Sequence, residues 1–172
     1  SELDAMLGED SHNTSALGLR ASVLTGMGRL DEAAATLERL IALDPDNAQS
    51  YRSLAQLELG RGRPAAALEL ARIGGGKRGA FGSLCAVEAA ALTALGRRDE
   101  AVSLLDGRLA ESPDDPEVLT GRATLHLAVG QTGRGEDLLR RAVVADALHH
   151  RSRLALAALL TGSGRGGEAV TL

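Results

Sequence analysis

The sequence predicts an all-α fold in which a pair of helices recurs along the chain. Composition is the first observation: 30 alanines and 31 leucines stand against 8 valines and 2 isoleucines in 172 residues. Alanine and leucine favour helices, whereas β-branched residues favour strands. The second observation is a glycine every 34 residues, at Gly28, Gly62, Gly96, Gly130 and Gly164. A fixed period of this length is typical of repeat proteins.

Two series of small residues keep the same period. The first is Ala21, Ala55, Ala89, Ala123 and Ala157, and the second is Ala33, Ala67, Ala101, Gly135 and Ala169. We expect both series to lie where two helices approach closely, because only a small side chain fits at such a contact. The glycine series is expected to end the first helix of each pair, since glycine adopts a positive φ without a Cβ penalty.

The first two units show how each helix pair is built. Apolar residues recur at helical spacing up to Gly28, which ends the first helix. Asp31 follows at a place typical of an N-cap, and the second apolar stripe ends at Asp44-Pro45. In the next unit Pro64 opens the second helix, which ends early at Gly74-Gly75-Gly76. The expected organisation is the end of an upstream repeat helix with a linker (1–13), four complete units (14–47, 48–81, 82–115 and 116–149) and a partial fifth unit (150–172).

This pattern resembles the tetratricopeptide repeat (TPR) family over essentially all of residues 14–172. The small residues Ala21, Gly28 and Ala33, together with Pro45, carry the resemblance through their echoes in later units. Most of the family's large aromatic residues are replaced. The residues where Trp or Tyr is common are Leu17, Tyr51, Cys85, Leu119 and Arg153. The resemblance implies a right-handed α-solenoid of antiparallel helix pairs with a concave inner groove.

Composition and charge exclude several classes of protein. No run of about 18 apolar residues occurs, so no membrane span is expected. The single cysteine, Cys85, excludes an intrachain disulfide and a cysteine-built zinc site. A net charge of −4 gives no indication of nucleic-acid binding. The first residues lack the pattern of a signal peptide, which predicts a cytoplasmic location, or a periplasmic one if a signal precedes this segment.

The sequence offers no set of residues typical of an enzyme, so we expect no catalytic residue, cofactor or metal. Glycines before Lys77 are superficially similar to a phosphate loop, but the Ser or Thr of that motif is missing, which favours a loosened turn between repeats. His149 and His150 follow Asp146 at a spacing that could hold a metal. Adjacent histidines point in different directions on a helix, so a solvated helix start is the favoured interpretation.

Two further interpretations concern polar or reactive residues inside the repeats. Cys85 is expected to be a core residue, and His126 a structural histidine between two helices. Glu88 and Arg122 occupy equivalent places in adjacent units, 34 residues apart, where other units carry leucine. We expect them to form an ion pair between these units, and the alternative is that both reach water.

Function is expected on the face of each first helix that does not pack against its partner. On this face we predict a partner-binding groove formed by Gln49, Arg52, Gln56, Ser83, Ala86, Ala90, Glu117, Thr120, Thr124 and Arg151. The equivalent face of the first unit carries Ser15, Gly18, Ser22 and Thr25. Small uncharged residues leave room for an inserted helix or peptide, and the alternative is a solvated polar face. Only Arg52 and Gln56 come close to the Lys and Asn with which some TPR domains hold a C-terminal carboxylate.

These observations predict a non-enzymatic protein–protein interaction scaffold that binds a protein or peptide segment in the concave groove. The alternative is the TPR region of a larger bacterial enzyme or secretion and assembly machine whose activity lies outside this segment. Arginine outnumbers lysine by 18 to 1, which is typical of GC-rich bacterial genomes. Neither end carries the polar cap typical of solenoids, which predicts a longer array or self-association through the open ends.

Overall fold

The computed structural model describes residues 13–77 and 82–171, and every regular element in these ranges is an α-helix. The all-α prediction is therefore confirmed. The chain forms two compact units, Ser1–Ala91 and Leu92–Leu172. None of the helices in the described ranges combines the length and the apolar character that crossing a membrane requires.

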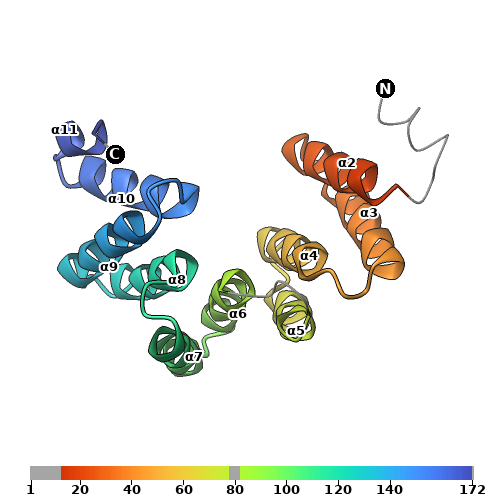
Figure 1. The fold of residues 1–172 in the computed structure, drawn as a ribbon, viewed down its shortest axis with the longest axis horizontal. Helices are drawn as coiled ribbons and strands as arrows, with labels where there is room; N and C mark the ends of the chain where they lie inside the picture. The colour runs from red at the N-terminus through yellow and green to blue at the C-terminus, as the bar shows by residue number, and fades with distance from the viewer. Residues whose placement is uncertain (1–12, 78–81, 172) are drawn as a thin grey trace. The chain divides into compact units, whose positions relative to one another are not determined.

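Short turns connect the helices, so that consecutive helices pack as antiparallel pairs: α2 with α3, α4 with α5, and α8 with α9 (Figure 1). The first unit contains α2 (Thr14–Gly26), α3 (Leu30–Leu43), α4 (Ala48–Gly60) and α5 (Pro64–Gly75), and α6 (Ser83–Ala94) crosses the division between the units. The second unit contains α7 (Arg98–Glu111), α8 (Pro116–Leu127), α9 (Thr132–Ala145), α10 (His150–Gly162) and α11 (Gly166–Ala169).

The glycine series forms the turn inside each helix pair, as predicted. Gly28, Gly62, Gly96, Gly130 and Gly164 all have φ between 72° and 76°. In the first turn the amide of Gly28 donates to the carbonyl of Thr25, and the amide of Arg29 donates to the carbonyl of Leu24. This is the Schellman arrangement, which satisfies the last carbonyls of a helix. A Cβ on Gly28 would meet nothing within 4 Å, so the left-handed backbone, and not lack of space, requires glycine there.

Side chains also set the starts of the first helices. Asn13, Asn47, Asp115 and His149 are the N-caps of α2, α4, α8 and α10. The prediction that Asp31 caps α3 was wrong. The tight glycine turn makes Arg29 the residue that precedes α3, and Asp31 lies within the first turn. A carboxylate there still interacts favourably with the positive end of the helix dipole.

The two series of small residues lie in the core, as predicted for the first four repeats. Ala33, Ala67 and Ala101 are 0% exposed, and the members of the other series from Ala21 to Ala123 are at most 2% exposed. In the last repeat, Ala157 and Ala169 are half-buried. The series also explains Gly135, because a Cβ at this position would lie 2.5 Å from Cδ2 of Leu127. Close helix packing thus depends on the absence of side-chain volume.

A cluster of four charges connects α11 to α9 in the second unit. Arg140 and Arg165 each contact both Glu136 and Glu168, at 2.7–2.9 Å. Hydrogen bonds from Arg165 and then Arg140 lower the pKa of Glu168 to about 2, and the same two partners lower the pKa of Glu136. The short α11 has no fully buried residue, so these charges add to the packing of its half-buried Ala169 against the core of the second unit.

Candidate functional site

Helices α2, α3 and α4 surround a hollow of about 380 Å³ in the first unit. The α2 wall consists of Gly18, Ser22 and Thr25, and the α4 wall of Ser53, Gln56 and Gly60. Ala21, Leu30, Leu37 and Leu57 form an apolar floor. None of these ten described lining residues carries a charge. The hollow can therefore accept an apolar or weakly polar group without leaving a charge unpaired.

Helical spacing places the three α2 residues on one face, because positions three and four apart are neighbours on a helix surface. The hydroxyl of Thr25 donates to the carbonyl of Ala21 at 2.8 Å. This hydroxyl is satisfied within the helix and needs no ligand. Gln56, on the opposite wall, is the one lining side chain with an amide, and so it can both donate to and accept from an inserted backbone.

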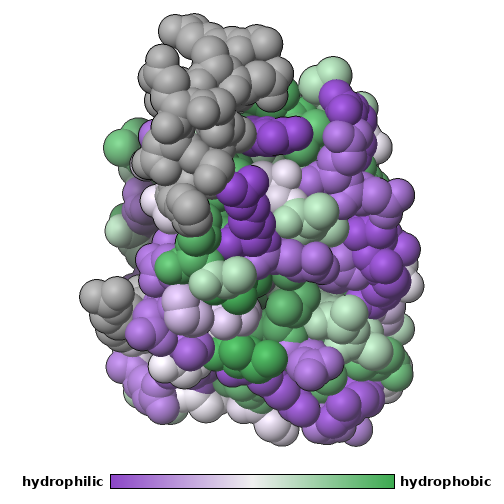
Figure 2. Space-filling view, turned by 90° about the vertical axis from the view of Figure 1, so that its right-hand side faces the viewer, coloured by the Kyte–Doolittle hydropathy of each residue, from purple (hydrophilic) through white to green (hydrophobic). Residues whose placement is uncertain are grey.

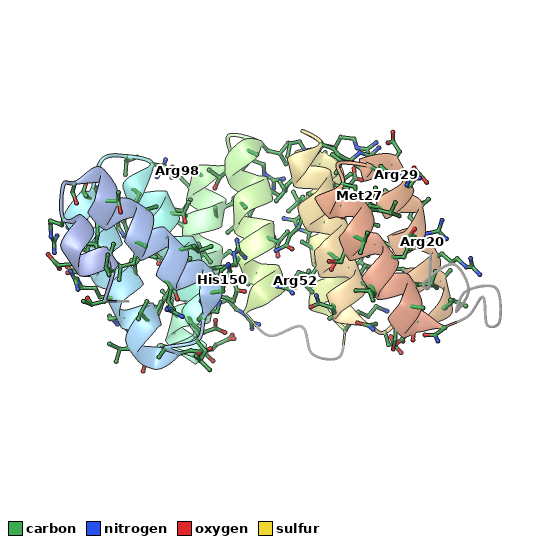
Figure 3. The ribbon with its side chains drawn as sticks, turned by 90° about the horizontal axis from the view of Figure 1, so that it is seen from above. Arg20, Met27, Arg29, Arg52, Arg98 and His150 are labelled. Atoms are coloured by element: carbon green, nitrogen blue, oxygen red, sulfur yellow. The ribbon has the colours of Figure 1, made fainter. Side chains whose placement is uncertain are left out.

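Gln49 and Arg52 lie on α4 towards its N-terminus, where Figure 3 labels Arg52. Neither is among the lining residues of the hollow. The Nε of Arg52 donates to Oε1 of Gln49 at 3.0 Å. Gln49 is exposed and Arg52 is half-buried. This bond holds the guanidinium along the helix, outside the lining of the hollow.

The predicted groove residues of α6 lie in different environments. Ala90 is exposed, whereas Ala86 is only 6% exposed and belongs to the packed part of the helix. Ser83 begins the helix, and its side chain lies outside the described residues. Cys85 is buried and forms no disulfide, as predicted for a core residue.

In the second unit the charged residues of the predicted groove pair with each other. Oε2 of Glu117, at the start of α8, accepts from Nη1 of Arg151 on α10 at 3.0 Å. The hydroxyls of Thr120 and Thr124 each donate to a carbonyl one helical turn earlier, at 2.7 and 2.9 Å. Thr120 is buried and Thr124 is exposed. Of these four residues, Thr124 presents an exposed face without a charge.

His149 differs from its predicted role as a solvated helix start. Its side chain is 14% exposed, and its Nδ1 accepts the amide of Ser152 as the N-cap of α10. Nε2 lies 3.3 Å from Oε1 of Glu117. Two partners on different helices bury the ring, whereas the neighbouring His150 is exposed (Figure 3). Among the described residues, no group of three His, Cys, Asp or Glu side chains could hold a metal ion.

The prediction that Glu88 and Arg122 pair with each other was wrong about both partners. Glu88 on α6 accepts from Nε of Arg72 on α5 at 2.9 Å. Arg122 on α8 donates through Nε to Asp106 on α7 at 2.6 Å. In both cases the partner is 16 residues earlier, on the preceding helix, which belongs to the preceding repeat. Packing of each first helix against the helix before it sets these pairs, and not the equivalence of the two positions.

The glycine run before Lys77 has a packing role that the sequence did not indicate. Helix α5 ends at Gly75, in agreement with the predicted early stop, and residues 78–81 lie outside the described residues. Gly74 is buried, and a Cβ there would lie 2.6 Å from Cβ of Tyr51 and 3.0 Å from Cδ1 of Leu84. The glycine allows α5 to approach α4 and α6 closely.

Near the end of the first helix, alternate repeats carry a polar residue at a position where the others carry leucine, a difference that was not predicted from the sequence. Glu58 and His126 occupy a position that is leucine in the other three repeats. Those leucines, Leu24, Leu92 and Leu160, are at most 5% exposed. Oε1 of Glu58 accepts from Arg63 at 2.7 Å, and Nδ1 of His126 lies 2.6 Å from the amide oxygen of Gln131. A polar residue at an otherwise apolar repeat position was the available signal, and the partner of His126 agrees with its predicted structural role.

In the three repeats with leucine at this buried position, the residue after the turn glycine is an arginine that forms an ion pair with a residue on the helix that follows. Arg29, Arg97 and Arg165 each contact a glutamate three residues later, at 2.6–2.7 Å. Arg63 lacks this glutamate, because Ala66 occupies its place, and it pairs backwards with Glu58 instead. Glu58 is therefore a buried carboxylate, 6% exposed, whose charge is compensated by Arg61 and Arg63.

Comparisons with known proteins agree with this geometry. Residues 19–74 and 88–118 match models of the tetratricopeptide repeat. No curated protein matches the chain. Among solved structures, the thermophilic TPR protein TTC0263 of Thermus thermophilus is 22% identical, with a TM-score of 0.72 over 92% of this chain and 87% of that one. The type IV pilus biogenesis factor PilW is 18% identical, with a TM-score of 0.68 over 98% of this chain and 79% of that one.

A third structure, YrrB, is described as a TPR protein with an unusual peptide-binding site. It is 13% identical, with a TM-score of 0.61 over 99% of this chain and 88% of that one. At these identities the likeness concerns the fold, that of TPR solenoids. Together with the family models, the glycine turns and the small-residue contacts, it shows that the chain belongs to the tetratricopeptide repeat family.

Proposed function

We propose that this chain is a non-enzymatic scaffold and that a protein or peptide segment binds in the hollow between α2 and α4. The observation that carries the proposal is the uncharged hollow of about 380 Å³, with small side chains on both walls and an apolar floor. Membership of the TPR family supports a protein partner, and YrrB is an example of this fold with a peptide-binding site. Accessible residues of the predicted groove remain candidates for further contacts, namely Gln49, Arg52 and Ala90 in the first unit and Thr124 and Arg151 in the second.

The lining of the hollow defines the chemistry of the segment. Burial of apolar area contributes about 25 cal/mol per Å² before association costs are subtracted. Gln56 adds hydrogen bonds that orient the segment but no net charge. The affinity should therefore depend weakly on salt, because screening acts on charge pairs and few form here.

A matched pair of variants tests this proposal. Ser22→Arg fills the hollow, whereas Ala35→Arg adds the same charge to an exposed position of α3 that does not line it. Proteins captured from a lysate by the native chain and by Ala35→Arg, but not by Ser22→Arg, are identified by mass spectrometry. The captured partner is then titrated at low and high salt. Equal capture by all three chains, or a steep salt dependence, would place the binding surface elsewhere.

The outer face of α2 favours a second candidate, self-association of the chain. Leu19 and Val23 on this helix, and Met27 at its C-cap, follow one another at intervals of four residues and are 56%, 44% and 63% exposed. Leu57, the equivalent of Val23 one repeat later, is only 6% exposed because it packs in the core formed with α2 and α3. On the side of the molecule shown in Figure 2, hydrophobic patches lie between hydrophilic residues.

A second copy of the chain could cover Leu19, Val23 and Met27, in the way that α3 covers Leu57 one repeat later. Sedimentation equilibrium of the native chain and of Val23→Lys tests this candidate. We expect the native chain to associate at high concentration and Val23→Lys to remain monomeric. A native chain that stays monomeric over the same concentrations would rule self-association out.

A further inference from the structure

A second pocket, of about 540 Å³, lies between α3 and α5 in the first unit. It uses a different face of α4 from the hollow described above, since it contacts Tyr51 and Leu54 instead of Ser53 and Gln56. Ile41, Leu70 and Ile73 complete its apolar lining. Ile73 is 46% exposed, so a bound apolar group could remove part of this side chain from water.

The charges of this pocket are unbalanced. Among the described lining residues, three carry a carboxylate, namely Glu38, Glu58 and Glu69, and one, Arg63, carries a guanidinium. Arg63 is paired with Glu58. Glu38 on α3 and Glu69 on α5 are exposed, and neither has an ion pair or hydrogen bond with any other described residue. Two carboxylates without compensating charge therefore flank an apolar lining.

The alternation between repeats explains part of the pocket's form. Ala66 lines the pocket at the place where three other repeats carry a glutamate. The short side chain leaves this part of α5 open and releases Arg63 to pair with Glu58. Ala42, on α3, is a second small lining residue. The small side chains of Ala42 and Ala66 leave the space open, and Glu38 and Glu69 form its acidic rim.

We propose that the pocket between α3 and α5 binds a protein segment that presents an apolar side chain between basic residues. The apolar side chain would contact Tyr51, Leu70 and Ile73, and the flanking Lys or Arg residues would pair with Glu38 and Glu69. Charge complementarity selects this chemistry, because an acidic segment would meet two carboxylates of the same sign. This surface is separate from the hollow between α2 and α4, so the chain can hold two segments at once.

The chain offers a direct readout of this pocket. Its only two isoleucines, Ile41 and Ile73, both line it, as does its only tyrosine, Tyr51. Isoleucine-methyl labelling therefore gives two NMR signals, both from this site. The probe is a short helical peptide with a central leucine flanked by lysines. Two matched peptides carry glutamate in place of the lysines, or alanine in place of the leucine.

We expect the lysine-flanked peptide to shift both methyl signals in a saturable manner and to change the fluorescence of Tyr51. The glutamate-flanked and alanine-centred peptides should bind at least about tenfold more weakly, a difference of about 1.4 kcal/mol. The double variant Glu38→Gln with Glu69→Gln should weaken binding similarly. Ala42→Phe, at an exposed position, should block the pocket by filling it.

Ser22→Arg, in the other hollow, should leave these shifts unchanged. The proposal is overturned if the lysine-flanked peptide moves neither methyl signal, or if the three peptides bind equally. It is also overturned if Ser22→Arg abolishes the shifts while the double glutamine variant and Ala42→Phe retain them. Circular dichroism of each variant confirms that the helices are intact before the titration.

Discussion

Nε of Arg72 lies 2.9 Å from Oε1 of Glu88, and the two equivalent positions one repeat later hold the same pair with its charges exchanged. There Asp106 accepts from Arg122 at 2.6 Å. The geometry of the contact between a second helix and the following first helix is thus kept while the direction of the charge pair is reversed. Where both positions carry a charge, the charges are opposite, and neither helix requires a particular sign.

Exchanging the charges at the first pair should therefore be tolerated. Arg72→Glu and Glu88→Arg each place like charges together, and the double variant restores the pairing in the order found between Asp106 and Arg122. Because Arg72 is 51% exposed, we expect a coupling free energy of about 0.2–1 kcal/mol. Urea denaturation of the four chains in a double-mutant cycle measures it. As a control, a cycle on Glu88 and Arg122 should be additive, and a coupling there would restore the pairing predicted from the sequence.

Two glycines inside helices should respond to alanine in opposite ways. Gly74→Ala should destabilise the chain by about 1–3 kcal/mol, since the new Cβ would overlap Cβ of Tyr51 on the facing helix. In Gly107→Ala, in the middle of α7, the new Cβ meets nothing within 4 Å, so the change should stabilise by up to about 1 kcal/mol through helix propensity. Thermal unfolding of both variants tests the contrast. A stabilising Gly74→Ala would mean that α5 does not approach Tyr51 so closely.

The buried carboxylate of Glu58 should be replaceable by the leucine that other repeats carry at its position. Glu58→Leu should change stability by less than about 1.5 kcal/mol, because removing a buried charge offsets the loss of its ion pairs. Its partners Arg61 and Arg63 are 17% and 48% exposed and can turn to water. Glu58→Ala should cost more, since it loses the same pairs and also leaves a void. Equal stability of the two variants would show that the position is not packed.

The sequence was sufficient to predict the features that each repeat imposes on its own backbone. A backbone φ near 75° requires glycine at Gly28 and at the equivalent position of each later repeat. Close contact between helices requires a small residue at Ala33 and Ala67. Such constraints recur at one spacing, so the period reveals them. The boundaries assigned to the repeats, and the binding role of the predicted groove residues, stay predictions.

Side-chain partners could not be predicted from the same period. Glu88 and Arg122 are equivalent in phase, but each meets the helix that precedes it, which a comparison of equivalent positions cannot indicate. The side chain of His149 was expected to be exposed, but its two ring nitrogens contact Glu117 and Ser152. Gly74 stands outside the repeat series, and its close approach depends on Tyr51 and Leu84. These relations arise from the angle and distance between helices, which the sequence specifies only through the whole packed unit.

Acid should weaken the attachment of α11 to α9 at a pH that depends on Glu168. Its hydrogen bonds with Arg165 and Arg140 lower the pKa of Glu168 from 4.5 to about 2 in the folded chain. A carboxylate whose pKa is lowered in the folded chain stabilises the fold at pH values above its ordinary pKa. This contribution is lost as the pH falls from about 4.5 towards 2. The lowered pKa of Glu136, which shares both arginines, acts in the same direction.

Amide hydrogen exchange of α11 measured between pH 5 and 2 tests this dependence, after correction for the intrinsic effect of pH on exchange. In the native chain we expect protection of α11 to decline over the interval between the two pKa values of Glu168, while α8 and α9 keep theirs for longer. Glu168→Gln cannot form the charged pairs, so it should start with weaker protection and lose less of it on acidification. Glu32→Gln is the matched control, because Glu32 makes the same contact three residues after an arginine but far from α11 in the sequence. If Glu168→Gln and Glu32→Gln gave the same pH profile for α11, the charge cluster would not contribute to holding this helix.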